Sequence, residues 1–206
     1  MKRLKRIATA VTVVTCIAVA PAALAVKGKA APTQPGKYKE WKGEIDQLEI
    51  VKVFRLADYD VVAVWGFATD DTPLPEMKDN TYEPVKKILT NIEGPLTAGI
   101  AEELHRKSIE VEASDRQGPG VLVVTGVVEE MDPGSQAARY WGGFGAGAAR
   151  TRLRIEVKDG ESGEVLLRIT QERRSGVGTY GGGYEELLNR NLAAIGADIA
   201  FVLGAF

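Results

Sequence analysis

Cysteine and histidine are almost absent from this chain of 206 residues, which contains one of each, Cys16 and His105. A single cysteine excludes a disulfide framework within the chain and any cysteine-rich metal site. A single histidine excludes a multi-histidine metal centre and leaves little scope for a Ser-His-Asp arrangement. The sequence therefore predicts neither a metal site nor a cofactor.

The chain also lacks an excess of positive charge. It has 26 basic and 28 acidic residues, and the first 25 residues hold four of the basic ones and none of the acidic ones. The remainder therefore has 22 basic and 28 acidic residues and a net charge of −6. Nonspecific nucleic-acid binding needs a basic surface, so this function is excluded. With 45% hydrophobic residues, the chain is apolar enough to bury a core.

Residues 1–25 have the pattern of a secretory signal peptide. A basic start precedes an apolar stretch over 7–20, Pro21 breaks that stretch, and Ala-Leu-Ala at 23–25 forms a small-x-small cleavage site. The apolar stretch is short for a membrane-spanning helix, and no later run is long enough. We expect a periplasmic or otherwise exported protein with no transmembrane segment after signal removal, although peripheral membrane association is compatible with it.

Cys16 leaves one alternative open. A cysteine that follows an apolar stretch can be the lipidated first residue of a bacterial lipoprotein, which would anchor the protein to a membrane. Thr15 occupies a position where such signals have glycine, alanine or serine, and the preceding apolar stretch is very short. These features favour a cysteine inside a removed signal peptide.

The rest of the chain predicts a flexible linker over 26–46 and a single α+β domain over 47–206. An apolar helical stripe runs from Tyr82 to Leu104 with a break at Gly94-Pro95, and a second stripe covers 188–202. Apolar, β-branched segments predict strands at 61–67, 109–113 and 121–128, with an edge strand within 48–56. We expect one mixed, mostly antiparallel sheet with two helices packed on one face.

Two alternating segments on either side of 159–163 predict a β-hairpin. Leu153, Ile155 and Val157 alternate with charged residues before the turn, and Val165, Leu167, Ile169 and Gln171 do so after it. Pairing 158 with 164 places Val157 opposite Val165. It also places Arg150 opposite Glu172 and the two like-charged residues Arg154 and Arg168 opposite each other.

The most unusual stretch is the glycine-rich segment from 134 to 149. Its glycine spacing resembles a phosphate-binding loop, but a strand follows instead of a helix and no lysine-serine pair is present, which argues against nucleotide binding. It either packs within the molecule or docks a partner through aromatic and arginine side chains. The candidate partner-binding residues are Arg139, Tyr140, Trp141, Gly143, Phe144, Gly145 and Gly147. A second glycine-rich segment covers 176–183.

Arg150, Arg152 and Arg154 lie on one face of the predicted hairpin, about 6 to 7 Å apart. Such a row could bind a phosphate, an acidic glycan or a lipid head group. The alternative is a solvated face that is neutralised by Glu156, Glu164 and Glu172.

The sequence contains no recognisable catalytic constellation. The acidic pairs Glu102-Glu103 and Glu185-Glu186 are adjacent on predicted helices, so their side chains diverge. His105 lies at a helix end, where it complements the helix dipole, and no partner motif makes it a general base. We expect a protein that is not an enzyme.

The segment from 134 to 202 resembles the bacterial envelope proteins grouped as domain-of-unknown-function family 4410. The matching features are Gly134-Ser135, Arg139, the Gly-Phe-Gly-Ala-Gly run over 143–147, the strand that ends in Val157-Lys-Asp, and residues 162–166. The later glycine-rich loop before a closing helix continues the likeness. The resemblance implies an exported envelope protein, often a lipoprotein, with an α+β domain and no catalytic residues.

These observations lead to two functional hypotheses. The first is an exported, non-enzymatic envelope module that binds an envelope protein, or itself, through the glycine-aromatic loop. The alternative is a binder of a small anionic ligand or lipid head group at the arginine row, which could serve as an accessory to transport.

Overall fold

The computed structural model describes residues 33–135, 147–175 and 183–206. Residues 31–206 form one compact unit, and the predicted signal peptide and the first part of the predicted linker, up to residue 32, lie outside the described residues. No helix among the described residues is long and apolar enough to cross a membrane.

One mixed sheet of seven strands organises the described residues, with the spatial order β1-β2-β7-β6-β5-β3-β4. β3 pairs in parallel with β4 and β5, and all other neighbours are antiparallel, as expected for a mixed, mostly antiparallel sheet. The strands are β1 (Gly36–Trp41), β2 (Ile45–Ile50), β3 (Val61–Ala68), β4 (Glu110–Glu112), β5 (Val121–Asp132), β6 (Ala149–Asp159) and β7 (Val165–Ser175).

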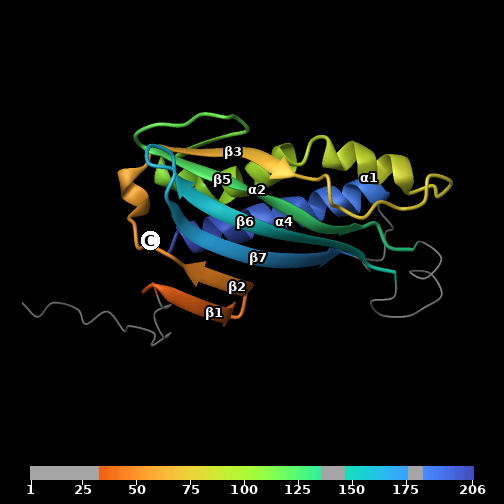
Figure 1. The fold of residues 1–206 in the computed structure, drawn as a ribbon, viewed down its shortest axis with the longest axis horizontal. Helices are drawn as coiled ribbons and strands as arrows, with labels where there is room; N and C mark the ends of the chain where they lie inside the picture. The colour runs from red at the N-terminus through yellow and green to blue at the C-terminus, as the bar shows by residue number, and fades with distance from the viewer. Residues whose placement is uncertain (1–32, 136–146, 176–182) are drawn as a thin grey trace, which may run out of the picture. The chain divides into compact units, whose positions relative to one another are not determined.

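Three α-helices accompany the sheet in the part of the chain that the structure describes, where two were predicted. They are α1 (Tyr82–Leu89), α2 (Glu93–Leu104) and α4 (Tyr184–Leu203), with short 3₁₀ turns at Leu56–Asp58 and His105–Lys107. The first helical segment is divided into two helices, as predicted, but the break lies at residues 90–92. Gly94-Pro95 lies in the first turn of α2, where proline is tolerated, unlike in a helix interior. α2 and α4 lie side by side behind the sheet (Figure 1).

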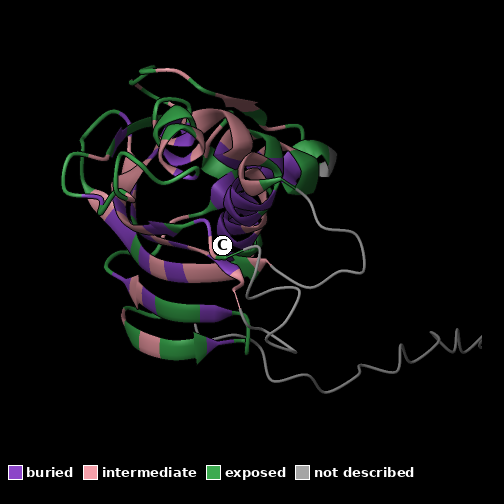
Figure 2. Cartoon of the chain, turned by 90° about the vertical axis from the view of Figure 1, so that its right-hand side faces the viewer, coloured by how far each residue is buried: buried purple, intermediate pink, exposed green. Residues whose placement is uncertain are grey.

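The core lies between these helices and one face of the sheet. Alternate residues of β6 are buried from Ala149 to Val157, and the buried residues of the other strands add to the banding in Figure 2. The helices contribute the predicted stripes, including Leu96, Ile100, Leu192 and Ile195, each fully buried. The opposite face of the sheet carries the charged residues of β6 and β7, so the alternation in sequence separates an apolar face from a polar one.

The β6–β7 hairpin forms as predicted, with its apolar residues on the core face, but its register is shifted by two residues. Val157 pairs with Leu167 instead of Val165, and the regular pairing is interrupted by an irregularity between Val157 and Lys158. The shift places Glu156 opposite Arg168, so the unfavourable Arg154–Arg168 pair does not form. A shift by two preserves which face each side chain occupies.

The linker predicted over 26–46 is wrong for its second half. Residues 36–41 form β1, which pairs with β2, and β2 begins at Ile45. β2 itself lies between β1 and β7, so the predicted edge strand within 48–56 starts earlier, ends at Ile50 and is not at the edge. Trp41 is 2% exposed and packs edge-on against Phe201 of α4 with ring centroids 5.8 Å apart, which ties this hairpin to the core.

Candidate functional site

Several chain segments meet at one end of the sheet, which we call the loop end. It comprises the end of β5 at Asp132, the start of β6 at Ala149, the end of β7 at Ser175 and the start of α4 at Tyr184. Ala149 pairs with Ser175, and Asp132 pairs with the second residue of β6. Both glycine-rich segments therefore connect at the same end of the sheet. The first joins the end of β5 to the start of β6, and the second follows the end of β7.

Most of the predicted partner-binding residues lie outside the described residues, because residues 136–146 and 176–182 are not described. This holds for Arg139, Tyr140, Trp141, Gly143, Phe144 and Gly145. Gly147 is described, and its carbonyl accepts a hydrogen bond from the Ser135 amide at 3.2 Å. Gly134 has φ +69°, and a Cβ there would lie 2.2 Å from the Gly147 oxygen. The base of the first loop is thus closed by a backbone contact that requires glycine at 134.

Side-chain hydrogen bonds anchor the elements of the loop end. The Thr72 hydroxyl, which is buried, donates to a carbonyl of β5 at 2.9 Å. Asn191 of α4 donates to the first carbonyl of β6 at 3.2 Å, and the Ser175 hydroxyl donates to a carbonyl in the first turn of α4 at 2.9 Å. Buried donors that are satisfied in this way hold their elements in a fixed arrangement.

A groove of about 710 Å³ opens at the loop end between the β3–α1 connection, the end of β5 and the start of α4. Met131 and Pro133 are buried at its base, and Leu74, 46% exposed, stands on one wall. No lysine, arginine or histidine is among the described residues that line it. The lining consists of Pro73, Leu74, Pro75, Asp79, Asn80, Thr81, Glu129, Glu130, Met131, Asp132, Pro133, Gly134, Ser135 and Tyr184.

Two carboxylates of the groove have no cationic partner among the described residues. Asp79 accepts hydrogen bonds from the Thr81 amide at 2.8 Å and the Thr81 hydroxyl at 2.7 Å. Asp132 accepts one from the Gly134 amide at 2.8 Å. Neither side chain forms an ion pair with another described residue, and both belong to exposed residues.

The predicted arginine row is present on the face of the sheet away from the helices. Arg150, Arg152 and Arg154 all lie on β6, and their side chains are between 38% and 59% exposed. An irregularity in β5 between Val128 and Glu130 brings one extra residue opposite β6. Such a bulge allows two consecutive side chains to reach the same neighbouring strand.

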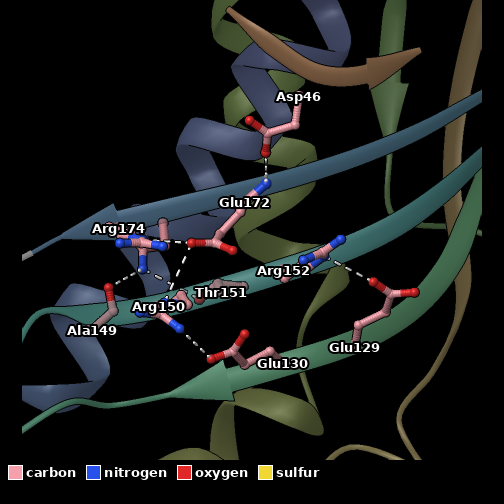
Figure 3. Close-up of polar contacts among 10 residues, drawn as sticks. Asp46, Glu129, Glu130, Ala149, Arg150, Thr151, Arg152, Glu172 and Arg174 are labelled. Carbon is pink, nitrogen blue, oxygen red and sulfur yellow. Dashed lines mark hydrogen bonds and ion pairs between the residues drawn. The ribbon is translucent and has the colours of Figure 1, made fainter. Parts of the chain in front are cut away.

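Each arginine of the row contacts a carboxylate. Figure 3 shows the contacts of Arg150 and Arg152. Glu129 lies 3.1 Å from Arg152 and 3.6 Å from Arg154, while Glu130 lies 3.3 Å from Arg150. Glu172 adds a second contact to Arg150 at 3.4 Å. Of the three neutralising residues that the sequence suggested, Glu172 is at the row. Glu156 pairs with Lys158 and Arg168, and Glu164 pairs with Lys52 at the opposite end of the hairpin.

Residues 62–179 match the family model described as Domain of unknown function (DUF4410). This chain belongs to that family. The DUF4410 segment runs from the start of β3 to just beyond β7, so it contains most of the groove, the whole arginine row, the first glycine-rich segment and the beginning of the second. The β1–β2 hairpin and α4 lie outside it.

Solved structures with a similar chain fold have low sequence identity to this DUF4410 protein. A PelC dodecamer from Paraburkholderia phytofirmans has 16% identity, covers 76% of this chain and 95% of its own, and gives a TM-score of 0.46. A putative neuraminyllactose-binding hemagglutinin homolog from Helicobacter pylori has 12% identity, covers 73% of this chain and 88% of its own, and gives a TM-score of 0.37. No curated protein matches the chain.

The acidic residues of this DUF4410 chain form no group that could hold a metal ion among the described residues. Glu185 pairs with Lys87 of α1 at 2.7 Å, and Glu186 pairs with Arg190 one turn ahead at 2.8 Å. His105 is exposed at the end of α2, where its Nδ1 contacts the Glu102 carbonyl. These contacts are structural, as the diverging acidic pairs predicted.

Hydrogen bonds lower the pKa of two aspartates in local turns. The hydroxyl and the amide of Thr81 hold the pKa of Asp79 below its usual value. At the β6–β7 turn, the amide and then the hydroxyl of Ser162 lower the pKa of Asp159, and the Tyr59 hydroxyl also donates to it at 2.9 Å. Hydrogen bonds to the charged form of a carboxyl favour ionisation.

Acid should therefore destabilise the fold. An aspartate with a lowered folded-state pKa contributes stability that is fully present above its unfolded pKa of about 3.9 and is lost as the pH falls through the folded value. We expect the melting temperature, followed by circular dichroism, to change little between pH 7 and 5 and to fall below about pH 4. Asp159→Asn should make this fall shallower. An equally steep fall in that variant would show that Asp159 does not contribute.

Proposed function

We propose that this DUF4410 chain is an exported, non-enzymatic envelope module that binds a protein partner, or a second copy of itself, at the loop end. The observation that carries the proposal is the convergence of both glycine-rich segments and a groove at one end of the sheet. The contacts would come from Arg139, Tyr140, Trp141 and Phe144, with Gly143, Gly145 and Gly147 between or after them. Aromatic and arginine side chains provide most of the binding energy at protein interfaces.

The anchored stems support this assignment. A binding segment loses less conformational entropy when its ends are held by a rigid scaffold, and here the ends are fixed by the Ser135–Gly147 contact and the strand pair Ala149–Ser175. Export supplies the setting, because the signal-like residues 1–25 direct such a module to the envelope.

The arginine row supports the alternative, an anion-binding protein, less well. An incoming phosphate or lipid head group would have to displace Glu129, Glu130 or Glu172 from contacts of 3.1 to 3.6 Å. Replacing a carboxylate by another anion would then add little binding free energy, because the carboxylates already neutralise the charge of the row. We infer that the ion pairs of the arginine row stabilise the outer face of the sheet.

A photo-crosslinking amino acid at Phe144 tests the proposal in cells that export the protein. We expect a discrete protein adduct at this position, identified by mass spectrometry. The matched control places the same crosslinker at Glu161, an exposed residue in the turn at the opposite end of the β6–β7 hairpin. Phe144→Ala should reduce the yield of the complex while the melting temperature stays unchanged. Equal adducts at both positions, or none at Phe144, would contradict the proposal.

A further inference from the structure

We propose that the groove at the loop end is the docking site for a cationic segment of a partner polypeptide. A lysine or arginine of that segment would pair with Asp79 and Asp132, and a neighbouring apolar side chain would pack against Leu74 and Met131. The inference rests on the proposed function and deepens it, because it names the chemistry of the partner at the loop end.

The shape of the groove is the first argument. Its volume of about 710 Å³ falls within the range of about 300 to 1,000 Å³ that is typical of ligand pockets. Three prolines, at 73, 75 and 133, lie in its lining and restrict the backbone of two of its walls. A preformed concave site loses little entropy when it binds, which favours a short extended segment as its occupant.

Charge complementarity selects a cation. Asp79 lies before α1 and Asp132 ends β5, so the two carboxylates that have no cationic partner among the described residues come from separate elements of the lining. Glu129 and Glu130 also line the groove, but they already contact the arginine row. The positive end of the α4 dipole is offset by Glu185 and Glu186 in its first turn. An anion would therefore meet repulsion, whereas a cation would meet two available partners.

The apolar surface selects a polypeptide over a small cation. Leu74 is 46% exposed beside the acidic rim, and Met131 and Pro133 form an apolar base. An isolated inorganic cation would leave this surface uncovered, whereas a basic residue next to an apolar one satisfies both parts of the lining. Lysine and arginine also cover apolar surface with their own aliphatic stems.

A random heptapeptide library displayed on phage and selected against the protein spanning residues 26–206 tests the inference. We expect enrichment of peptides in which lysine or arginine adjoins an apolar residue. The variant Asp79→Asn/Asp132→Asn keeps both side-chain acceptors for the local amides but removes both charges. A selected peptide should bind it roughly five- to tenfold more weakly, and the difference should shrink as salt rises.

The matched control removes two exposed carboxylates away from the groove, Glu103→Gln and Glu161→Gln, and should leave peptide binding unchanged. Selection without basic residues, or unchanged binding to the Asp79→Asn/Asp132→Asn variant, would overturn the inference. A third outcome would also overturn it. If peptides bind only after residues 137–145 are replaced by a glycine-serine linker, the chain's own segment is the occupant.

The two proposals fail in different ways. If the adduct at Phe144 forms equally in the wild type and the Asp79→Asn/Asp132→Asn variant, the partner does not use the groove and the proposed function stands. If the selected basic peptides depend on the two aspartates but Phe144 yields no adduct, the groove binds cations and the glycine-aromatic loop is not the interface.

Discussion

Replacing Gly99 with alanine should destabilise the protein by about 3 kcal/mol, because this residue lies where α2 crosses α4 with no room for a side chain. A Cβ at Gly99 would lie 2.0 Å from the Ala193 carbonyl oxygen, and one at Gly196 would lie 2.3 Å from the Leu96 oxygen. Both obstructing atoms belong to the backbone, so they cannot rotate away. The helices would have to separate, which would loosen the buried contacts on both sides of the crossing.

Whether Gly99→Ala lowers or raises the free energy of unfolding distinguishes an effect of helix packing from an effect of helix propensity. In an open helix, glycine to alanine stabilises by about 1 kcal/mol, so propensity alone predicts the opposite result. Gly183→Ala is the matched control, because a Cβ there meets nothing within 4 Å and its φ of −62° suits any residue. Urea unfolding should show a large loss for Gly99→Ala and a change below about 0.5 kcal/mol for Gly183→Ala. A Gly99→Ala protein as stable as the wild type would refute the close crossing.

The β6–β7 hairpin shows which structural features a sequence pattern can predict and which it cannot. Alternation identified both strands and placed Leu153, Ile155 and Leu167 on the core face, as observed. It could not determine the pairing, because a period of two is unchanged when one strand slides by two residues. The observed register depends on an irregularity next to Val157 that no residue in the sequence predicts.

The β1–β2 hairpin was missed for a different reason. Residues 36–41 include two lysines, a glutamate and a glycine, and among them only Trp41 is buried. Their strand conformation comes from pairing with β2, and β2 in turn pairs with β7, more than 110 residues later in the chain. Tertiary pairing of this kind overrides weak local propensity.

The candidate site was predicted in part. The glycine and aromatic composition of the segment from 134 to 149 was visible in the sequence and remains the basis of the proposed function. The groove beside it was not visible, because its walls come from 73–81, 129–135 and Tyr184, which only the fold brings together. Pro73, Pro75 and Asp79 are visible in the sequence, but residues of these types indicate no more than a loop or turn.

Asp198→Ala should cost about 2 to 3 kcal/mol, because it removes the centre of a polar network between α4, β7 and β2. Asp198 is 7% exposed and accepts hydrogen bonds from Arg173 Nε at 2.7 Å and Gln171 Nε2 at 2.8 Å. The Gln171 amide also donates to the Glu44 carbonyl at 3.0 Å and accepts from the Asp46 amide at 2.9 Å. The network therefore holds the start of β2 against the core.

The position of the network predicts where the damage appears. Without the carboxylate, Gln171 loses one acceptor while buried. Arg173, whose pKa the Asp198 hydrogen bonds raise, then keeps one ion-pair contact among the described residues, to Glu44 at 4.0 Å. Hydrogen exchange should accelerate most in β1 and β2, because the contacts of Gln171 with Glu44 and Asp46 hold the turn and the start of β2. Glu186→Ala, which breaks an exposed pair on the same helix, should change stability by less than about 0.5 kcal/mol and leave β1 and β2 protected. Uniform acceleration across all strands in Asp198→Ala would mean that the network stabilises the whole domain and does not secure this hairpin in particular.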